Sequence, residues 1–119
     1  MNRTVLVVED EGQLREVVVE ALGDLGYRIL VAADGHEAVR ILQGPEPIDL
    51  LFTDVTMPNG LSGVDVAVSA AELRPELRVL LVSGYAKGQL PPFPDHAHFI
   101  QKPYRMSQLL SKFKELWGE

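Results

Sequence analysis

Ionisable and hydroxyl side chains follow four apolar runs of this sequence within one or two residues. The acids Glu9, Asp10 and Asp54 follow two of these runs, the hydroxyl of Ser83 follows a third and the ammonium group of Lys102 a fourth. Clustered carboxylates repel one another and raise one another's pKa, so a hard, oxygen-seeking cation such as Mg²⁺ is their natural partner. Whether these groups meet depends on the elements that carry them.

The apolar runs have the composition of β-strands. The first, Thr4 to Val8, is β-branched and apolar without alternation, which is typical of a strand covered on both faces. The other predicted strands are Tyr27 to Ala32, Ile48 to Thr53, Leu77 to Val82 and Ala97 to Ile100.

Helical periodicity fills the intervals between these strands. Apolar residues recur at helical spacing from Glu11 onward, and Gly26 is placed to end that helix. A second helix is predicted from Asp34 to Gln43, with Asp34 and Glu37 as an N-terminal capping pair. We therefore expect a helix to follow each of the first two strands.

Two further helices are predicted after the third and fifth strands. Ser62 can cap a helix that ends near Pro75. The last helix has an apolar stripe made of Leu109, Leu110, Phe113, Leu116 and Trp117. Strands and helices thus alternate through the whole sequence.

This alternation predicts an α/β fold with a five-stranded parallel, doubly wound sheet of order 2-1-3-4-5, as in flavodoxin-like proteins. In such folds ligands bind outside the carboxyl ends of the strands, near the point where the strand order reverses. The side chains of Glu9, Asp10, Asp54, Ser83 and Lys102 are therefore expected to share one cleft.

Composition narrows the class of protein. The 119 residues are 46% hydrophobic and 24% charged, which fits one domain over residues 1–119 with a substantial core. A net charge of −6 argues against a nucleic-acid surface, and the absence of cysteine excludes disulfides and thiolate sites. The first apolar run is too short for a signal peptide or a membrane span, so we expect a cytoplasmic protein with no membrane partner.

Each candidate residue also has a purely structural interpretation. Asp10 with Gln13 could form a capping box, and Asp54 could support the turn that follows it. Ser83 could begin an ordinary loop, and Lys102 could be a solvated surface lysine. These structural interpretations do not explain why the candidate residues all fall at matching strand ends, so we favour a functional site.

The segments VLVVEDE, DVTMPNGLSGVDVA, VLLVSGYA and FIQKPY, in this order and spacing, resemble a response-regulator receiver domain of two-component signalling. By that resemblance Asp54 is the phosphorylation site. Mg²⁺ is bound by Asp10, Asp54 and the backbone carbonyl of Thr56, and Glu9 supports the metal through water. The phosphoryl donor is then a histidine kinase or a histidine phosphotransfer protein.

The resemblance also assigns roles around the phosphoryl group. Ser83 and Lys102 contact the phosphoryl oxygens, and Lys102-Pro103 is the family's cis peptide. Ser83 and Phe99 act as switch residues, while Thr56 and Tyr85 tune hydrolysis. The domain is then not an enzyme in the ordinary sense, because it assists only its own phosphorylation and dephosphorylation.

Two departures from the usual family pattern are visible. The loop MPNGLSG is one residue longer than usual and, with SGYA, resembles receivers of hybrid sensor histidine kinases, which favours a fused kinase or effector domain outside this chain. Pro91, Pro92 and Pro94 occupy the place of the family's fourth helix. Proline removes helical hydrogen bonds and clashes with the preceding turn, so we predict that this helix is short or absent.

Other classes of function remain open at this stage. A phosphatase with an aspartate nucleophile normally has a second acid two residues later, where this sequence has Thr56. A flavodoxin-like flavin binder needs a phosphate loop after the first strand, but the acids of EDEGQ would repel a phosphate. A phosphorylation-independent docking module usually loses part of the acid, hydroxyl and lysine set.

Overall fold

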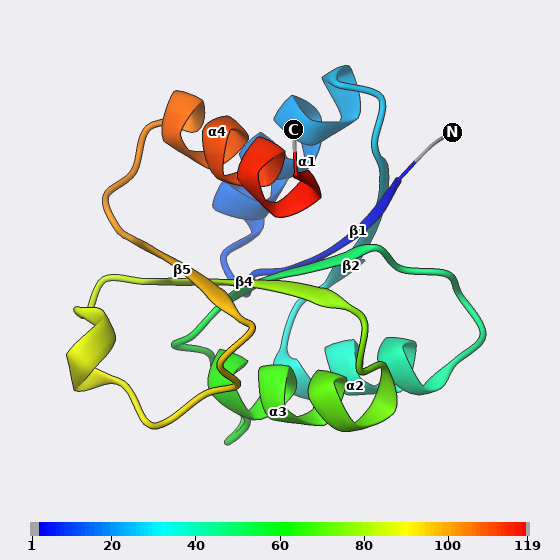
Figure 1. The fold of residues 1–119 in the computed structure, drawn as a ribbon. Helices are drawn as coiled ribbons and strands as arrows, with labels where there is room; N and C mark the ends of the chain where they lie inside the picture. The colour runs from blue at the N-terminus through cyan, green and yellow to red at the C-terminus, as the bar shows by residue number, and fades with distance from the viewer. Residues whose placement is uncertain (1–2, 119) are drawn as a thin grey trace.

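The computed structural model describes residues 3–118 and contains one five-stranded sheet. All neighbouring strands are parallel, and their order is β2-β1-β3-β4-β5 (Figure 1). The strands are β1 (Thr4–Val8), β2 (Arg28–Ala32), β3 (Leu50–Asp54), β4 (Arg78–Ser83) and β5 (His98–Gln101). The predicted flavodoxin-like topology is confirmed, although β2 to β5 each begin one or two residues later than predicted.

Four α-helices cover the two faces of the sheet within the described residues. They are α1 (Gly12–Asp24), α2 (Gly35–Gln43), α3 (Gly63–Leu73) and α4 (Met106–Trp117). Figure 1 shows α1 and α4 on one face and α2 and α3 on the other. The sheet is therefore the middle layer of three.

Each face of the sheet has its own apolar core. Alternate residues of β1 divide between them: Val5 and Val7 pack with α1 and α4, whereas Leu6 and Val8 pack with α2 and α3. All four side chains are almost completely buried, which confirms the prediction of a strand covered on both sides. This burial anchors the carboxyl end of β1, where the candidate acids begin.

The helix starts follow the predicted capping residues in two cases out of three. Asp34 accepts a hydrogen bond from the N–H of Glu37 at the start of α2, and Ser62 forms a capping box with Asp65 at the start of α3. At the start of α1 the N-cap is Glu11, and it makes no side-chain capping bond. The capping-box interpretation of Asp10 with Gln13 is therefore wrong, because the N-cap position lies one residue beyond Asp10, at Glu11.

A single 3₁₀ turn, η1 (Lys87–Gln89), lies where the resemblance to receiver domains places a fourth helix. The proline-rich segment that follows has no regular secondary structure up to β5. Leu90 and Phe93 of this stretch pack against the core on the α2 and α3 face. The prediction of a short or absent helix is confirmed, and two apolar side chains cover the core in its place.

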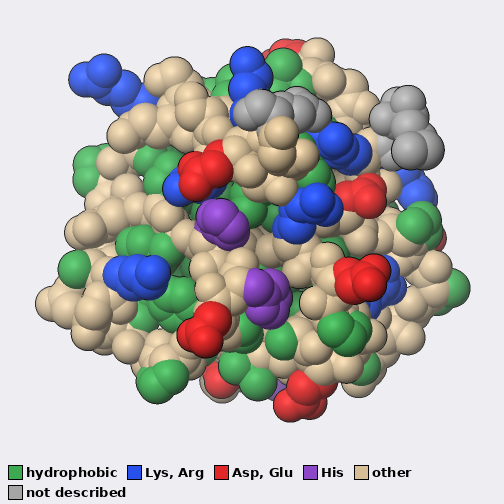
Figure 2. Space-filling model, in the orientation of Figure 1, with side chains coloured by type: hydrophobic (Ala, Val, Ile, Leu, Met, Phe, Trp, Pro, Cys, Tyr) green, Lys and Arg blue, Asp and Glu red, His purple; other side chains and the backbone are tan. Residues whose placement is uncertain are grey.

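No helix among residues 3–118 has the length and apolar character needed to cross a bilayer. On the face seen in Figure 2, acidic and basic side chains are interspersed rather than gathered into one charged area. The acids singled out in the sequence lie instead at the carboxyl edge of the sheet.

Candidate functional site

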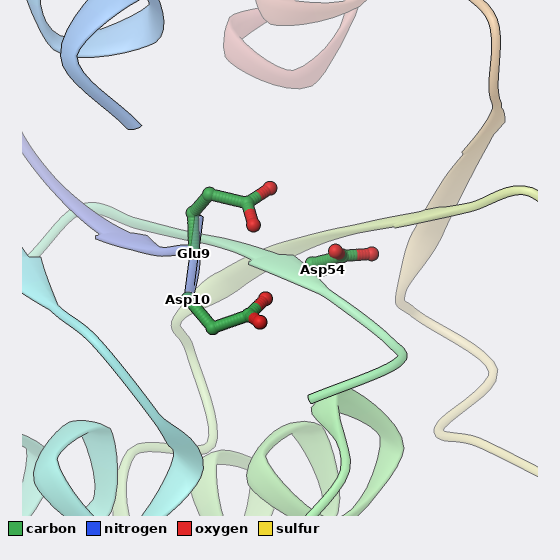
Figure 3. Close-up of side chains that lie close together, drawn as sticks. All are labelled: Glu9, Asp10 and Asp54. Atoms are coloured by element: carbon green, nitrogen blue, oxygen red, sulfur yellow. The ribbon is translucent and has the colours of Figure 1, made fainter. Parts of the chain in front are cut away.

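Three carboxylates meet at the carboxyl edge of the sheet. Glu9 and Asp10 directly follow β1, and Asp54 is the last residue of the adjacent strand β3. Each offers a carboxylate oxygen, and the three oxygens lie within 4.8 Å of one another. Figure 3 shows the side chains of Glu9 and Asp10 extending from the end of β1 toward the side on which Asp54 lies. Since Val8 pairs with Thr53 in the β1–β3 register, the sheet itself brings the acids together.

The turn after β1 is held by backbone contacts of Glu9. The carboxylate of Glu9 accepts a 3.1 Å hydrogen bond from the N–H of Glu11, and its own N–H donates to Ala32 of β2. Arg15 on the first turns of α1 donates to the carbonyl oxygen of Glu9 at 2.8 Å. Sequence patterns do not reveal this role of Arg15, because helical periodicity marks it only as a polar position.

Lys102 places an ammonium group beside the acids. Its Nζ lies 3.1 Å from Oδ2 of Asp54 and 3.9 Å from Oε1 of Glu9. The backbone N–H of Lys102 donates to the carbonyl of Ser83 at 2.7 Å, and the Lys102–Pro103 peptide bond is cis. The ammonium group of Lys102 therefore contacts Glu9 and Asp54, two of the three acids.

Ser83 ends β4 with its side chain buried. Its Oγ accepts a 3.0 Å hydrogen bond from the N–H of Tyr85. This bond uses a lone pair of the hydroxyl and not its proton, so the hydroxyl keeps its capacity to donate. Ser83 lies one residue beyond the pairing of Asp54 with Val82, at the same edge as the acids.

The remaining residues singled out in the sequence surround this edge without joining the acid cluster. Thr56 is exposed in the loop after β3, and Tyr85 is 59% exposed in the loop after β4. Phe99 of β5 is half-buried against the core on the α2 and α3 face. All three positions thus lie close along the chain to Asp54, Ser83 or Lys102.

Gly63 supports Asp54 in a way that the sequence analysis missed. A Cβ placed on Gly63 would collide with the backbone carbonyl of Asp54, so the first turn of α3 packs directly against the main chain of that aspartate. The hydroxyl of Thr53 also donates to that carbonyl at 2.9 Å. A glycine at the start of a helix is too common for the sequence alone to reveal such a contact.

Burial changes the acidity of the site. Removal from water raises the pKa of Glu9 to about 7, and the negative charge of Asp54 adds to this, while the Glu11 N–H and Lys102 oppose it. Burial also raises the pKa of Asp54, against the lowering effect of the hydrogen bond and charge of Lys102. The sequence indicated that the acids raise one another's pKa, and the structure shows that desolvation is a larger cause than this repulsion for both Glu9 and Asp54.

Tyr104 is a further neighbour that the sequence analysis did not identify. Burial raises the pKa of its phenol, and the negative charges of Glu9 and Asp54 raise it further. The ring packs with the core on the α1 and α4 face. Tyr104 therefore lies close enough to Glu9 and Asp54 for their charges to act on its phenol.

The donor set fits a small hard cation. Carboxylate oxygens of Glu9, Asp10 and Asp54 converge, with Asp10 exposed to solvent. Mg²⁺ prefers oxygen ligands and usually keeps several waters, which the open side of the cluster allows. The ammonium group of Lys102 balances only part of the negative charge of three ionised carboxylates.

The comparisons with known proteins agree with this geometry. The family model of the response regulator receiver domain matches residues 5–114. The response regulator receiver protein CpdR of Brucella abortus is 31% identical over 117 residues, which cover 96% of each chain. The sensor kinase CckA of the same organism is 35% identical over 97% of this chain, but the chain spans 12% of that kinase's length.

A solved structure extends the likeness to three dimensions. The response regulator protein TrrA of Thermotoga maritima, crystallised in complex with Mg²⁺-BeF, superposes with a TM-score of 0.84 and 30% sequence identity. The match covers 96% of this chain and 98% of that one. With the fold, the carboxyl-edge acids and a family match over almost its whole length, this chain belongs to the response regulator receiver domain family.

Proposed function

We propose that residues 1–119 form one receiver domain that accepts a phosphoryl group on Asp54. The observation that carries this proposal is the position of Asp54 at the end of β3, with its carboxylate beside two further acids and 3.1 Å from the ammonium group of Lys102. A carboxylate in such a setting is a nucleophile whose charge can be balanced during attack.

In the proposed reaction a carboxylate oxygen of Asp54 attacks the phosphorus of a phosphohistidine. The new O–P bond forms as the P–N bond breaks, and the electron pair leaves with the imidazole nitrogen of the donor. The product is an acyl phosphate on Asp54. Burial of Asp54 limits solvent around the attacking oxygen, which strengthens the electrostatic interactions at the site.

The residues that would hold Mg²⁺ are Asp10, Asp54 and the backbone carbonyl of Thr56, with Glu9 acting through water. When bound, Mg²⁺ neutralises the nucleophile and the incoming phosphoryl oxygens together. Glu9 and Asp54 must be ionised for this role, although burial raises the pKa of both.

Once Asp54 is phosphorylated, Lys102 pairs with the added charge and the hydroxyl of Ser83 donates to a phosphoryl oxygen. The contact of Ser83 with the phosphoryl group draws the loop after β4 toward Asp54. The side chain of Phe99 repacks as this loop moves. Thr56 and Tyr85 border the approach of water and thereby tune hydrolysis. In this proposal the domain assists its own phosphorylation and dephosphorylation and has no other substrate.

The proposed phosphoryl donor is a histidine kinase or a histidine phosphotransfer protein. The chain is similar both to the receiver protein CpdR and to part of the sensor kinase CckA, so a fused kinase or effector domain outside this chain stays part of the proposal. A separate receiver and a fused one use the same Asp54 chemistry, so the donor class does not depend on this arrangement.

The proposal is tested by incubating the protein with acetyl phosphate and following intact mass. With Mg²⁺ the wild type should gain one phosphoryl group, while excess EDTA or Asp54→Ala should prevent the gain. Asp24→Ala, which removes an exposed acid at the end of α1, should be labelled like the wild type.

A wild type that stays unmodified, under conditions that label a known receiver, would overturn the proposal. Absence of Mg²⁺ binding by calorimetry in the same protein would then assign the domain to phosphorylation-independent docking. Labelling of Asp54→Ala would place the acceptor at another residue.

A further inference from the structure

The loop between β3 and α3 is attached to the start of α2, a helix that carries none of the site residues. The attachment centres on Asn59, whose backbone has a φ of 70°. Positive φ is uncommon outside glycine, and asparagine is one of the residues that tolerate it best. In this conformation both the side chain and the carbonyl of Asn59 contact residues at the start of α2.

Two hydrogen bonds join the loop to α2. The side-chain amide of Asn59 donates to Oδ2 of Asp34 at 3.0 Å, and Nε2 of His36 lies 2.8 Å from the carbonyl oxygen of Asn59. Because a carbonyl oxygen only accepts, the second contact places a proton on Nε2 of His36. We call Asp34, His36 and Asn59 the loop latch.

Asp34 serves the helix and the loop at once. Its Oδ1 accepts the N–H of Glu37 and caps α2, while its Oδ2 accepts the amide of Asn59. The Glu37 bond, followed by the Asn59 bond, holds the pKa of Asp34 below its ordinary value. The carboxylate thus stays ionised and able to accept both bonds.

Close packing reinforces the latch. A Cβ on Gly35, the first residue of α2, would lie 2.8 Å from the carbonyl oxygen of Leu61 and 3.0 Å from its Cβ. The loop therefore rests directly on the main chain of α2 at this point.

Within the described residues 3–118, every hydrogen bond that ties positions 56–61 to another element passes through Asn59. The loop is also anchored at its two ends, where Val55 donates to Val82 and Gly63 donates to Val55. Thr56 lies between the first anchor and the latch, three residues before Asn59. The Asn59 bonds therefore tie to α2 the same short loop that carries Thr56.

We propose that the loop latch is a positioning device that holds the carbonyl of Thr56 in place for the divalent cation and so sets the rate of phosphoryl transfer to Asp54. This inference rests on the proposed function. Asp34, His36 and Asn59 touch neither the cation nor the phosphoryl group, and they act through the backbone of the loop.

Three substitutions open the latch while sparing other roles of the same residues. Asn59→Gly keeps the positive φ and the carbonyl but removes the amide. Asp34→Ser keeps an N-cap oxygen but removes the second oxygen. His36→Ala removes the ring and its bond to the carbonyl of Asn59. His36→Gln should restore that bond, because the glutamine amide N–H can donate from a similar position.

Each protein is examined by calorimetric Mg²⁺ titration, by the initial rate of phosphorylation with acetyl phosphate and by thermal unfolding. Loss of one latch bond should weaken Mg²⁺ binding and lower the rate at subsaturating Mg²⁺ by about three- to tenfold. Saturating Mg²⁺ should restore most of the rate, and His36→Gln should behave like the wild type. The matched control is Glu46→Ala, which breaks an equally exposed 3.0 Å ion pair with Arg28 far from the loop.

Wild-type affinity and rate in Asn59→Gly, Asp34→Ser and His36→Ala would overturn the latch proposal while leaving Asp54 phosphorylation intact. The latch proposal also fails if Glu46→Ala lowers Mg²⁺ affinity as much as they do, since general destabilisation would then be the cause. Failure of the wild type itself to bind Mg²⁺ or to be phosphorylated would instead overturn the proposed function.

Discussion

The two edges of the sheet both gather charged side chains, but they balance that charge in different ways. At the carboxyl edge, Glu9 and Asp54 are buried with Asp10 close by, and the ammonium group of Lys102 lies in contact with Glu9 and Asp54. At the amino edge, the guanidinium groups of Arg3 and Arg78 lie over the ring of Trp117, 4.2 and 5.3 Å from its centroid.

Polar groups at the amino edge are paired within the chain. The indole N–H of Trp117 donates to the hydroxyl of Tyr27 at 2.9 Å, and Nε of Arg78 donates to the carbonyl of Leu116 at 2.6 Å. Nearby, Arg74 donates to three carbonyl oxygens, those of Leu42, Gly44 and Glu46. These contacts within the chain stabilise the fold at this edge.

The carboxyl edge holds more negative charge than its neighbours balance. Burial raises the pKa of Glu9 and of Asp54, which means that the folded state resists their ionisation. One end of the sheet therefore contributes stability, whereas the other carries an electrostatic cost that a bound cation would relieve. Substitutions and pH changes at each edge test this difference.

The largest effect is expected at the amino edge. Trp117→Ala should lower the free energy of unfolding by about 3–5 kcal/mol, because it removes a buried aromatic side chain together with its hydrogen bond and cation–π contacts. Urea unfolding measures the loss. Trp117→Phe should be milder because it keeps an aromatic ring, and a loss below about 1 kcal/mol for the alanine variant would contradict a stabilising role for this edge.

The buried acids of the carboxyl edge should make the free energy of unfolding fall as pH rises. Glu9 has a folded pKa of about 7 against an ordinary value of 4.5, so the folded state binds more protons than the unfolded state in this window. Without Mg²⁺, stability should decrease by about 2–3 kcal/mol from about pH 4.5 to about pH 7.5, and the raised pKa of Asp54 acts in the same direction.

Chemical denaturation across this pH range measures the dependence. Glu9→Gln should flatten the curve and be more stable than the wild type near neutral pH. Stability that rises through the window, or an unchanged curve in Glu9→Gln, would show that burial of Glu9 carries no such cost.

The smallest effect concerns the balance between Lys102 and the cation. Lys102→Met removes a positive charge 3.1 Å from Asp54, so Mg²⁺ should bind about three- to tenfold more tightly, equivalent to about 1 kcal/mol. Calorimetric titration measures the change. Lys112→Met, which disrupts a lysine paired with Glu115 on α4, is the control and should leave the affinity unaltered. Weaker binding in Lys102→Met would mean that this lysine organises the acids rather than competing with Mg²⁺.

Much of the fold could be predicted from local patterns. The unbroken apolar run of β1 predicted a strand buried on both faces, and three prolines predicted the loss of a helix after β4. These predictions succeed because strand burial and proline sterics depend on a few adjacent residues. The interpretation of Asp10 as a helix cap was wrong because it also used only adjacent residues, and such a local pattern does not decide where a helix begins.

The candidate site could be predicted as a set of residues but not as an arrangement. Parallel strands expose their carboxyl ends at one edge, so Glu9, Asp10, Asp54, Ser83 and Lys102 were expected to be neighbours. The leading role of burial in the pKa values of Glu9 and Asp54, rather than mutual repulsion, emerged only from the packing around them. The residue roles taken from the family resemblance remain predictions for the experiments above.

The order of elements, the two-sided burial of the sheet and the kind of chemistry available at its carboxyl edge follow from the sequence, because periodicity and residue type act locally. The distant groups that support that chemistry are visible only in the folded domain. The contact of Arg15 with Glu9, the fit of Gly63 against Asp54 and the Asn59 latch all depend on how helices pack against loops. Such contacts join positions whose separation along the chain carries no periodic signal, so their geometry is set by packing of the whole domain.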